Sequence, residues 1–213
     1  MAEHNLDKSD LKERVAGILL AGGRSGRMGG GDKCLHLLGG RPILARIIER
    51  AAPQVARLVV NANGDPQRFA QFGLPVVADT VDGYAGPLAG VLTGLEWAMA
   101  NAPECDWIAT FATDAPFFPE DVVERLGQAV AGNGGDMACA VSGGRRHPVF
   151  GLWPVALHAE LRRALTEQGI RKVDEWTKDY NLREVVFGVD TIDPFFNVNW
   201  PEDLATAETI LVD

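Results

Sequence analysis

An apolar run of six residues, from Val15 to Leu20, contains no polar position and no alternation. Such a run is typical of a strand that is buried on both faces of a parallel sheet. Between Pro42 and Ala52 the pattern changes, because apolar residues recur there at helical spacing and charged residues occupy the opposite side. The chain therefore predicts a buried strand and, after a loop, an amphipathic helix that covers the sheet.

The same succession of short apolar runs and helical patterns continues along the chain. Alternating strands and helices predict an α/β fold, a doubly wound and mostly parallel sheet with helices on both faces. The length of 213 residues fits one domain, which we expect to span residues 14–213 after a disordered leader of residues 1–13. Further strands are expected at 58–60, 76–78, 107–111, 137–141, 149–153 and 182–187, and further helices at 66–72, 87–100, from about 119, at 155–168 and from 201.

The segment after the first strand is rich in glycine, with six glycines among the thirteen residues from Ala21 to Lys33. Glycine lets backbone N–H groups turn toward one point and lets an anion approach without meeting a Cβ atom. Arg24, Arg27 and Lys33 supply cations against a single acidic residue, Asp32. The segment therefore predicts a loop that binds polyphosphate.

Two familiar phosphate loops do not fit this segment. A dinucleotide fingerprint needs G-x-G-x-x-G opening directly into a helix, and a Walker loop needs a lysine followed by Ser or Thr. Here Asp32 precedes Lys33, and Cys34 follows it. A flexible glycine loop with solvated charges is the remaining simple alternative.

The composition limits the kinds of partner that we expect this protein to bind and the cellular compartment in which we expect it. Binding along a nucleic-acid backbone depends on clustered Lys and Arg, so the net charge of −9 argues against a nucleic-acid surface and leaves any nucleotide as a small ligand. Three cysteines without C-x-x-C spacing indicate neither a disulfide framework nor a thiolate zinc site. No apolar stretch has the length of a signal peptide or a membrane span. We expect a cytoplasmic protein with no membrane partner.

Polar residues stand just after three of the predicted strands. Asn61 follows the second strand, Asp79 the third and Asp114 the fourth, and ligands of open α/β sheets bind at this edge. A lone carboxylate beside a polyphosphate suits Mg²⁺, which commonly takes one or two carboxylates together with phosphate oxygens. Each residue could instead be a turn residue or a helix cap, in the case of Asp114 for the helix expected near Pro119.

The glycine-rich segment resembles the signature L-A-G-G-x-S-x-R-M-G-x-D-K of the molybdenum cofactor guanylyltransferases, with one additional residue before the Asp-Lys pair. Two further family motifs are similar: (Cys/Thr)-Asp-x-Pro at Thr113 to Pro116, and Asn-Val-Asn-x-Pro-Glu-Asp at Asn197 to Asp203. The chain departs from the family at Trp200, where a capping Thr or Ser is usual; losing a cap weakens a helix start by about 1 kcal/mol. The signature positions are Leu20, Ala21, Gly22, Gly23, Ser25, Arg27, Met28, Gly29, Asp32 and Lys33.

This resemblance runs from Val15 to about Leu204 and implies a Rossmann-like nucleotidyltransferase fold. It implies a nucleotide-binding half, residues 15–116, and an acceptor half on the pterin side, residues 117–213. It further implies catalytic roles for Lys33, Arg27 and Asp114, with Asp114 as the ligand of a catalytic Mg²⁺ cofactor. The nucleotide contacts that it implies are Leu20, Ala21, Gly22, Gly23, Lys33, Asn61, Asp79, Asn197 and Asn199.

Two features favour guanine over cytosine. Guanine presents N1–H and N2–H₂ side by side, a donor pair that one carboxylate can accept and that cytosine lacks, so Asp79 could make the choice. Related cytidylyltransferases typically read L-A-A-G, whereas this chain has Gly22 followed by Gly23. Both features favour the guanine branch of the family.

The activity that the resemblance implies is transfer of GMP from Mg·GTP to the terminal phosphate of molybdenum-bound molybdopterin, with release of pyrophosphate. A molybdopterin cytidylyltransferase, another small nucleotidyltransferase and a non-catalytic GTP- or pterin-binding protein stay open as alternatives. Whether another protein of molybdenum cofactor biosynthesis delivers the pterin also stays open. His147 is expected to be structural, and Arg145 and Arg146 are either contacts for an anionic second substrate or solvated turn residues.

Overall fold

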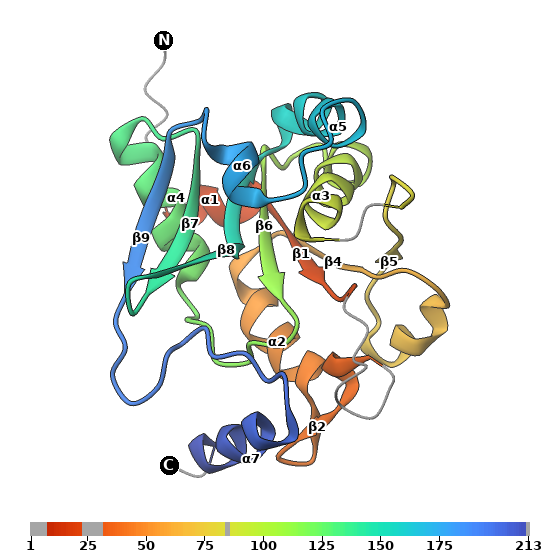
Figure 1. Ribbon diagram of the computed structural model, residues 1–213, viewed down its shortest axis with the longest axis vertical. Helices are drawn as coiled ribbons and strands as arrows, with labels where there is room; N and C mark the ends of the chain where they lie inside the picture. The colour runs from red at the N-terminus through yellow and green to blue at the C-terminus, as the bar shows by residue number, and fades with distance from the viewer. Residues whose placement is uncertain (1–7, 23–31, 84–85, 212–213) are drawn as a thin grey trace.

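The computed structural model describes residues 8–22, 32–83 and 86–211 (Figure 1). Within these residues, seven strands form a sheet in the order β5-β4-β1-β6-β8-β7-β9. Neighbouring strands are parallel except where β8 pairs with β6 and β7, which confirms the predicted, mostly parallel sheet. The strands are β1 (Val15–Leu20), β4 (Arg57–Asn61), β5 (Val76–Val77), β6 (Trp107–Ala112), β7 (Met137–Ser142), β8 (Arg145–Pro154) and β9 (Leu182–Phe187).

Helices cover both faces of this sheet, and each face has its own hydrophobic cluster (Figure 1). The interior strand β1 shows why two layers are needed: Val15 and Leu19 are buried in one cluster, and Ile18 is buried in the other. One face is covered by α2 (Ile43–Ala51) and α4 (Val122–Asn133), and the other by α3 (Pro87–Asn101), α5 (His158–Thr166) and α6 (Val173–Thr177). No helix in the described ranges is long and apolar enough to cross a membrane.

Several shorter elements differ from the prediction. The expected helix at 66–72 is the 3-10 helix η3 (Pro66–Phe72), and the one at 155–168 divides into η4 (Val155–Leu157) and α5. The helix expected from about 119 begins three residues later, at Val122. Segments too short to show a period were not predicted; these are α6, the hairpin of β2 (Leu37–Leu38) and β3 (Arg41–Pro42), and the 3-10 turns η1 (Lys33–Leu35) and η2 (Ala52–Gln54). The closing helix is α7 (Pro201–Ile210).

The predicted disordered leader over residues 1–13 is wrong in its second half, where α1 (Lys8–Glu13) forms. Leu11 is 5% exposed and packs on α4 at Gly127. A Cβ atom at Gly127 would lie 2.1 Å from Leu11 Cδ2, so the glycine makes room for the leucine. One apolar side chain in a polar segment gives no periodic signal, and only packing reveals its role. Residues 1–7 lie outside the described part.

Candidate active site

Four parallel strands end in register at one edge of the sheet. Leu20 at the end of β1 pairs with Asn61 on β4 and with Ala112 on β6, and Asn61 in turn pairs with Val77 on β5. The loops that leave these strands border a cavity of about 640 Å³, a volume typical of small-molecule sites. The predicted residues that line it are Leu20, Ala21, Gly22, Lys33, Asn61, Asp79 and Asp114.

Lys33, the last residue of the predicted phosphate loop, contacts two segments that are distant in the sequence: the loop after β6 and the segment before α7. Its Nζ lies 3.2 Å from Asp114 Oδ2 and donates a hydrogen bond to Asn199 Oδ1 at 2.5 Å. The backbone N–H of Val198 donates to the Asp114 carbonyl at 2.7 Å, which fixes the closing segment against the loop after β6. The structure therefore brings together Lys33, Asp114 and Asn199, three residues that the resemblance assigned to one site.

Asp114 is not the cap of the following helix. That helix, α4, begins at Val122 with Asp121 in the N-cap position, whereas the Asp114 carboxylate faces Lys33. Its neighbour Thr113 donates from Oγ1 to the Leu20 carbonyl at 3.0 Å and so ties the end of β6 to the end of β1. The carboxylate is held beside Lys33, at the end of the predicted phosphate loop, and the capping alternative is wrong.

The oxygen atoms around Lys33 suit a hard divalent cation that arrives with a nucleotide. Among the described residues, no group of three or more His, Cys, Asp and Glu side chains could hold a metal by itself. Mg²⁺ does not require one, because phosphate oxygens and water complete its octahedron around one or two protein carboxylates. Asp114 offers one carboxylate, and its side chain is 26% exposed. The residues present fit such an ion.

The Asp79 carboxylate is oriented by two asparagines. Asn61 Nδ2 donates to Oδ1 at 2.9 Å, and Asn63 Nδ2 donates to Oδ2 at 2.8 Å. Asn63 Oδ1 also accepts the backbone N–H of Asp79 at 2.9 Å. An ionised carboxylate accepts about four hydrogen bonds, so each oxygen keeps capacity for another donor. This geometry suits a ligand that presents two adjacent N–H groups.

Two residues that hold this arrangement were given no role by sequence reasoning, although Asn63 was expected, with Asn61, at the carboxyl end of a strand. Asn63 stands in the same turn as Asn61, and no pattern distinguishes a turn asparagine from a carboxylate partner. Gly90 on α3 leaves room for Asn61, because a Cβ atom there would lie 2.6 Å from Asn61 Oδ1. A glycine inside a helix costs stability and suggests a packing reason, which was the available signal.

Arg68 on η3 connects Asp32, in the predicted phosphate loop, to Asn63, in the turn after β4. Its Nε lies 3.2 Å from Asp32 Oδ2, and its Nη2 donates to the Asn63 carbonyl at 2.7 Å. Cys34, which lies near both Asp32 and Arg68, is 2% exposed. Burial, followed by the nearby charge of Asp32, raises the pKa of the Cys34 thiol to about 12. Cys34 is therefore a protonated packing residue and not a nucleophile.

The other predicted contacts divide into three groups. Gly23 and Arg27 lie outside the described residues, and their roles stay predictions. Ala21 uses its backbone N–H within the protein, donating to the Asn61 carbonyl at 2.9 Å, whereas a Cβ atom at Gly22 would meet none of the described residues within 4 Å. Asn197 is half-buried and is not among the residues that line the cavity.

The start of α7 is capped from within the helix. Trp200 occupies the N-cap position, and Asp203 in the first turn accepts the backbone N–H groups of Asn199 at 2.8 Å and of Trp200 at 2.9 Å. This carboxylate offsets the weak helix start that Trp200 predicts. It also fixes the backbone of Asn199, the residue that contacts Lys33.

Among residues 117–213, His147 packs within the protein as expected. Its ring stacks on Phe195 with centroids 4.7 Å apart, and its Nε2 lies 2.7 Å from Ser142 Oγ. Burial lowers the pKa of His147 and favours the neutral ring. Arg146 is paired with Glu184, so its charge is already engaged, and the alternative of an anion contact is weakened for this residue.

A cation, a carboxylate and a cavity of nucleotide size suit the transfer of a nucleotidyl group from one phosphate to another, a reaction that needs no protein nucleophile. Together with the sheet, they define the class of this protein, which is a nucleotidyltransferase. The chain belongs to the family of MobA-like NTP transferase domains, whose model matches residues 17–181.

Relatives agree with this class, and a solved structure shares the fold. A molybdenum cofactor guanylyltransferase of Rhodopseudomonas palustris strain BisB5 is 54% identical over 193 residues, which are 91% of this chain and 92% of the relative. One from Mesorhizobium japonicum is 50% identical over 94% of this chain and 98% of its own length. The crystal structure of molybdopterin-guanine dinucleotide biosynthesis protein A from Archaeoglobus fulgidus has the same fold, with a TM-score of 0.72 at 24% identity, over 92% of this chain and 98% of that chain.

Proposed function

We propose that this protein transfers GMP from GTP to the terminal phosphate of molybdenum-bound molybdopterin, which gives molybdopterin guanine dinucleotide and pyrophosphate. The observation that carries the proposal is the Lys33–Asp114 pair in the same cavity as the Asp79 carboxylate. The Lys33–Asp114 pair suits a triphosphate with its metal, and the Asp79 carboxylate suits guanine. The two relatives described above are both named molybdenum cofactor guanylyltransferase, which supports this reaction.

The nucleotide would lie along the carboxyl edge of the sheet. Asp79 would accept guanine N1–H and N2–H₂ on the free lone pairs of its two oxygens, while Asn61 and Asn63 keep the carboxylate in its plane. The triphosphate would reach toward Gly22 and Lys33, which both line the cavity: the glycine carries no side chain, and the lysine supplies charge. The base and the phosphates would thus contact residues that follow different strands of the sheet.

The chemical step would be an in-line displacement at the α-phosphorus of GTP. An oxygen of the pterin phosphate forms the new P–O bond, and the bond to pyrophosphate breaks with its electrons on the leaving group. The attacking oxygen is already ionised, so no general base is required. Lys33 would neutralise the charge that grows on the leaving pyrophosphate, and Arg27 is proposed for the same task on the basis of the motif alone.

Nucleotidyltransferases of this family generally use a divalent metal ion, and we propose Mg²⁺ for this chain. Asp114 would hold it, since this carboxylate lies beside the phosphate loop and is partly exposed. When bound, the ion neutralises the triphosphate and helps to orient its α-phosphorus. The task of Lys33 and Asn199 would be to hold the carboxylate in place before the nucleotide arrives.

The same proposal includes a cytoplasmic location and a pterin substrate that another biosynthetic protein could deliver. Support for a reducing compartment comes from Cys34, Cys105 and Cys139, which are buried and unpaired.

A nucleotide screen tests the proposed reaction. GTP, CTP, ATP and UTP are offered with Mg²⁺ and molybdenum-loaded molybdopterin, and pyrophosphate release is followed. We expect release with GTP, dependent on both the metal and the pterin. Equal or faster release with CTP would assign the protein to the cytidylyl branch, and GTP binding without release in the presence of the pterin would assign it a carrier role.

A further inference from the structure

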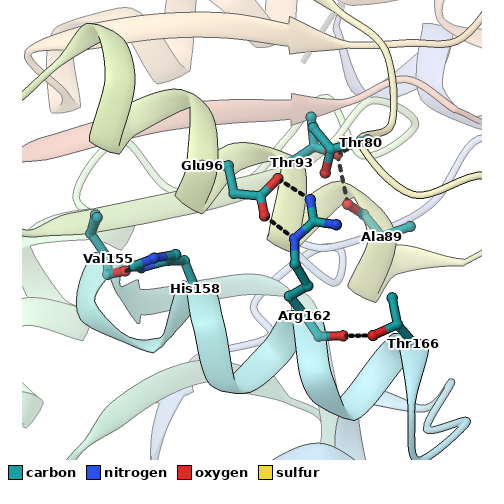
Figure 2. A network of polar contacts seen from close by, with 8 residues as sticks. All are labelled: Thr80, Ala89, Thr93, Glu96, Val155, His158, Arg162 and Thr166. Carbon is teal, nitrogen blue, oxygen red and sulfur yellow. Dashed lines mark hydrogen bonds and ion pairs between the residues drawn. The ribbon is translucent and has the colours of Figure 1, made fainter.

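The residue after Asp79 is attached to a different element, the helix α3. The backbone N–H of Thr80 donates to Thr93 Oγ1 at 3.2 Å, and that hydroxyl donates its own hydrogen to the Ala89 carbonyl at 2.9 Å (Figure 2). Thr93 is completely buried. One side chain therefore links the loop that carries Asp79 to the first turn of α3, which also borders the cavity at Pro87 and Gly90.

A structural role confined to the helix explains only half of this arrangement. Threonine in a helix often donates to the carbonyl four residues earlier, and the bond from Thr93 to Ala89 is of that kind. The bond accepted from Thr80 comes from another element, and the helix does not need it. What the bond supplies is a fixed position for the backbone beside Asp79.

A second side chain of α3, that of Glu96, also interacts with Thr80. Glu96, three residues after Thr93, accepts two hydrogen bonds from Arg162 on α5, at 2.7 and 2.8 Å (Figure 2). Burial opposes ionisation of Glu96, yet hydrogen bonds from Arg162 and from the Thr80 hydroxyl hold its pKa below the ordinary value. The ion pair joins Glu96, in the predicted nucleotide-binding half, to Arg162, in the predicted acceptor half. The support for Thr80 is therefore attached to α5 and not to the loop that carries Asp79.

We propose that Thr93 is a positioning residue for base selection, which acts through Thr80 to fix the Asp79 carboxylate, with the Glu96–Arg162 pair as its brace. Asn61 and Asn63 set the plane of the Asp79 carboxylate. The backbone on the C-terminal side of Asp79, at Thr80, is held by Thr93 instead. Reading two adjacent donors requires placement within about 0.5 Å. This inference rests on the proposed function, because it takes Asp79 to be the residue that reads guanine.

The test compares GTP with ITP, whose base lacks the 2-amino group and offers only one of the two donors. Dissociation constants of both nucleotides are measured by calorimetry with Mg²⁺, and their ratio is the discrimination. Asp79→Asn should lower the ratio by about tenfold, because a hydrogen bond to a charged group is lost. Thr93→Val keeps the shape of the side chain but removes the hydroxyl. It should lower the ratio by roughly threefold, because a displaced Asp79 carboxylate loses part of the same hydrogen-bond energy. Thr93→Ser should restore the ratio.

A double variant and a control show whether the effect passes through Asp79. In an Asp79→Asn background, Thr93→Val should cause no further loss of discrimination, because the group that it positions is absent. Thr206→Val removes an exposed hydroxyl that donates to the carbonyl of Glu202, four residues earlier on α7, at 3.0 Å, and it should leave the ratio unchanged. If Thr93→Val does not fold, the exposed Thr80→Val removes the bond to Glu96 and should lower the ratio in the same direction.

The outcomes separate this inference from the proposed function. If Asp79→Asn collapses the ratio while Thr93→Val and Thr80→Val preserve it, Asp79 reads guanine without help from Thr93, and the inference is overturned. Equal weakening of GTP and ITP by Thr93→Val would make Thr93 purely structural and would overturn the inference as well. If Asp79→Asn itself preserves the ratio, guanine is read elsewhere and the proposed role of Asp79 fails first.

Discussion

Replacing Lys33 with Met removes the cation that lies 3.2 Å from Asp114 Oδ2 and 2.5 Å from Asn199 Oδ1 but keeps most of the side-chain stem. The ion pair is partly exposed, with 20% of the Lys33 side chain and 26% of the Asp114 side chain accessible. Pairs in such surroundings contribute at most about 1 kcal/mol. We therefore expect the melting temperature to fall by no more than about 2–4 °C for a domain of this size.

Turnover should fall much further than stability. The polyphosphate presents its greatest charge as pyrophosphate leaves, so the contact with Lys33 strengthens in the transition state. Removing one preorganised donor lowers a rate by about 10² or more, which corresponds to about 2.7 kcal/mol. We expect a fall of this order in kcat for pyrophosphate release, with a smaller change in the dissociation constant for GTP.

The assay is pyrophosphate release at saturating pterin, together with calorimetry for GTP binding. Lys178→Met is the matched control, because Lys178 is an exposed lysine after α6 whose removal changes the net charge equally. It should leave kcat and the dissociation constant unaltered. A Lys33→Met protein with normal kcat and a raised KM would refute the reasoning, since the lysine would then bind ground state and transition state alike.

Three further predictions use other parts of the site. Asp114→Asn should abolish turnover and the Mg²⁺ dependence of GTP affinity while circular dichroism stays unchanged; near-normal turnover would place the metal elsewhere. Gly90→Ala should weaken GTP binding in calorimetry, because the added Cβ would lie 2.6 Å from Asn61 Oδ1, whereas Gly132→Ala on α4 meets nothing within 4 Å and should be harmless. Cys34, whose pKa is raised to about 12, should react with iodoacetamide at pH 8 far more slowly in the native protein than in urea, by mass spectrometry; equal rates would contradict its burial.

Local patterns in the sequence were sufficient for the sheet and for much of the candidate site. The unbroken apolar run of β1 predicted burial on both faces, and the structure buries Val15 and Ile18 in opposite clusters. The rule that ligands bind beyond the carboxyl ends of parallel strands placed Asn61, Asp79 and Asp114 at one edge, and all three line the cavity. These features depend on residue order along one strand and the loop after it, which a sequence displays directly.

Only the tertiary structure decided which side chains meet. Lys33 and Asn199 are 166 residues apart and share a hydrogen bond because the closing segment is fixed to the Asp114 loop. Thr93 and Leu11 look like an ordinary helix residue and a stray apolar residue until packing places them against Thr80 and α4. Period and strand-end position are local properties, whereas the direction and partner of a side chain depend on the packing of distant elements, which no local pattern specifies.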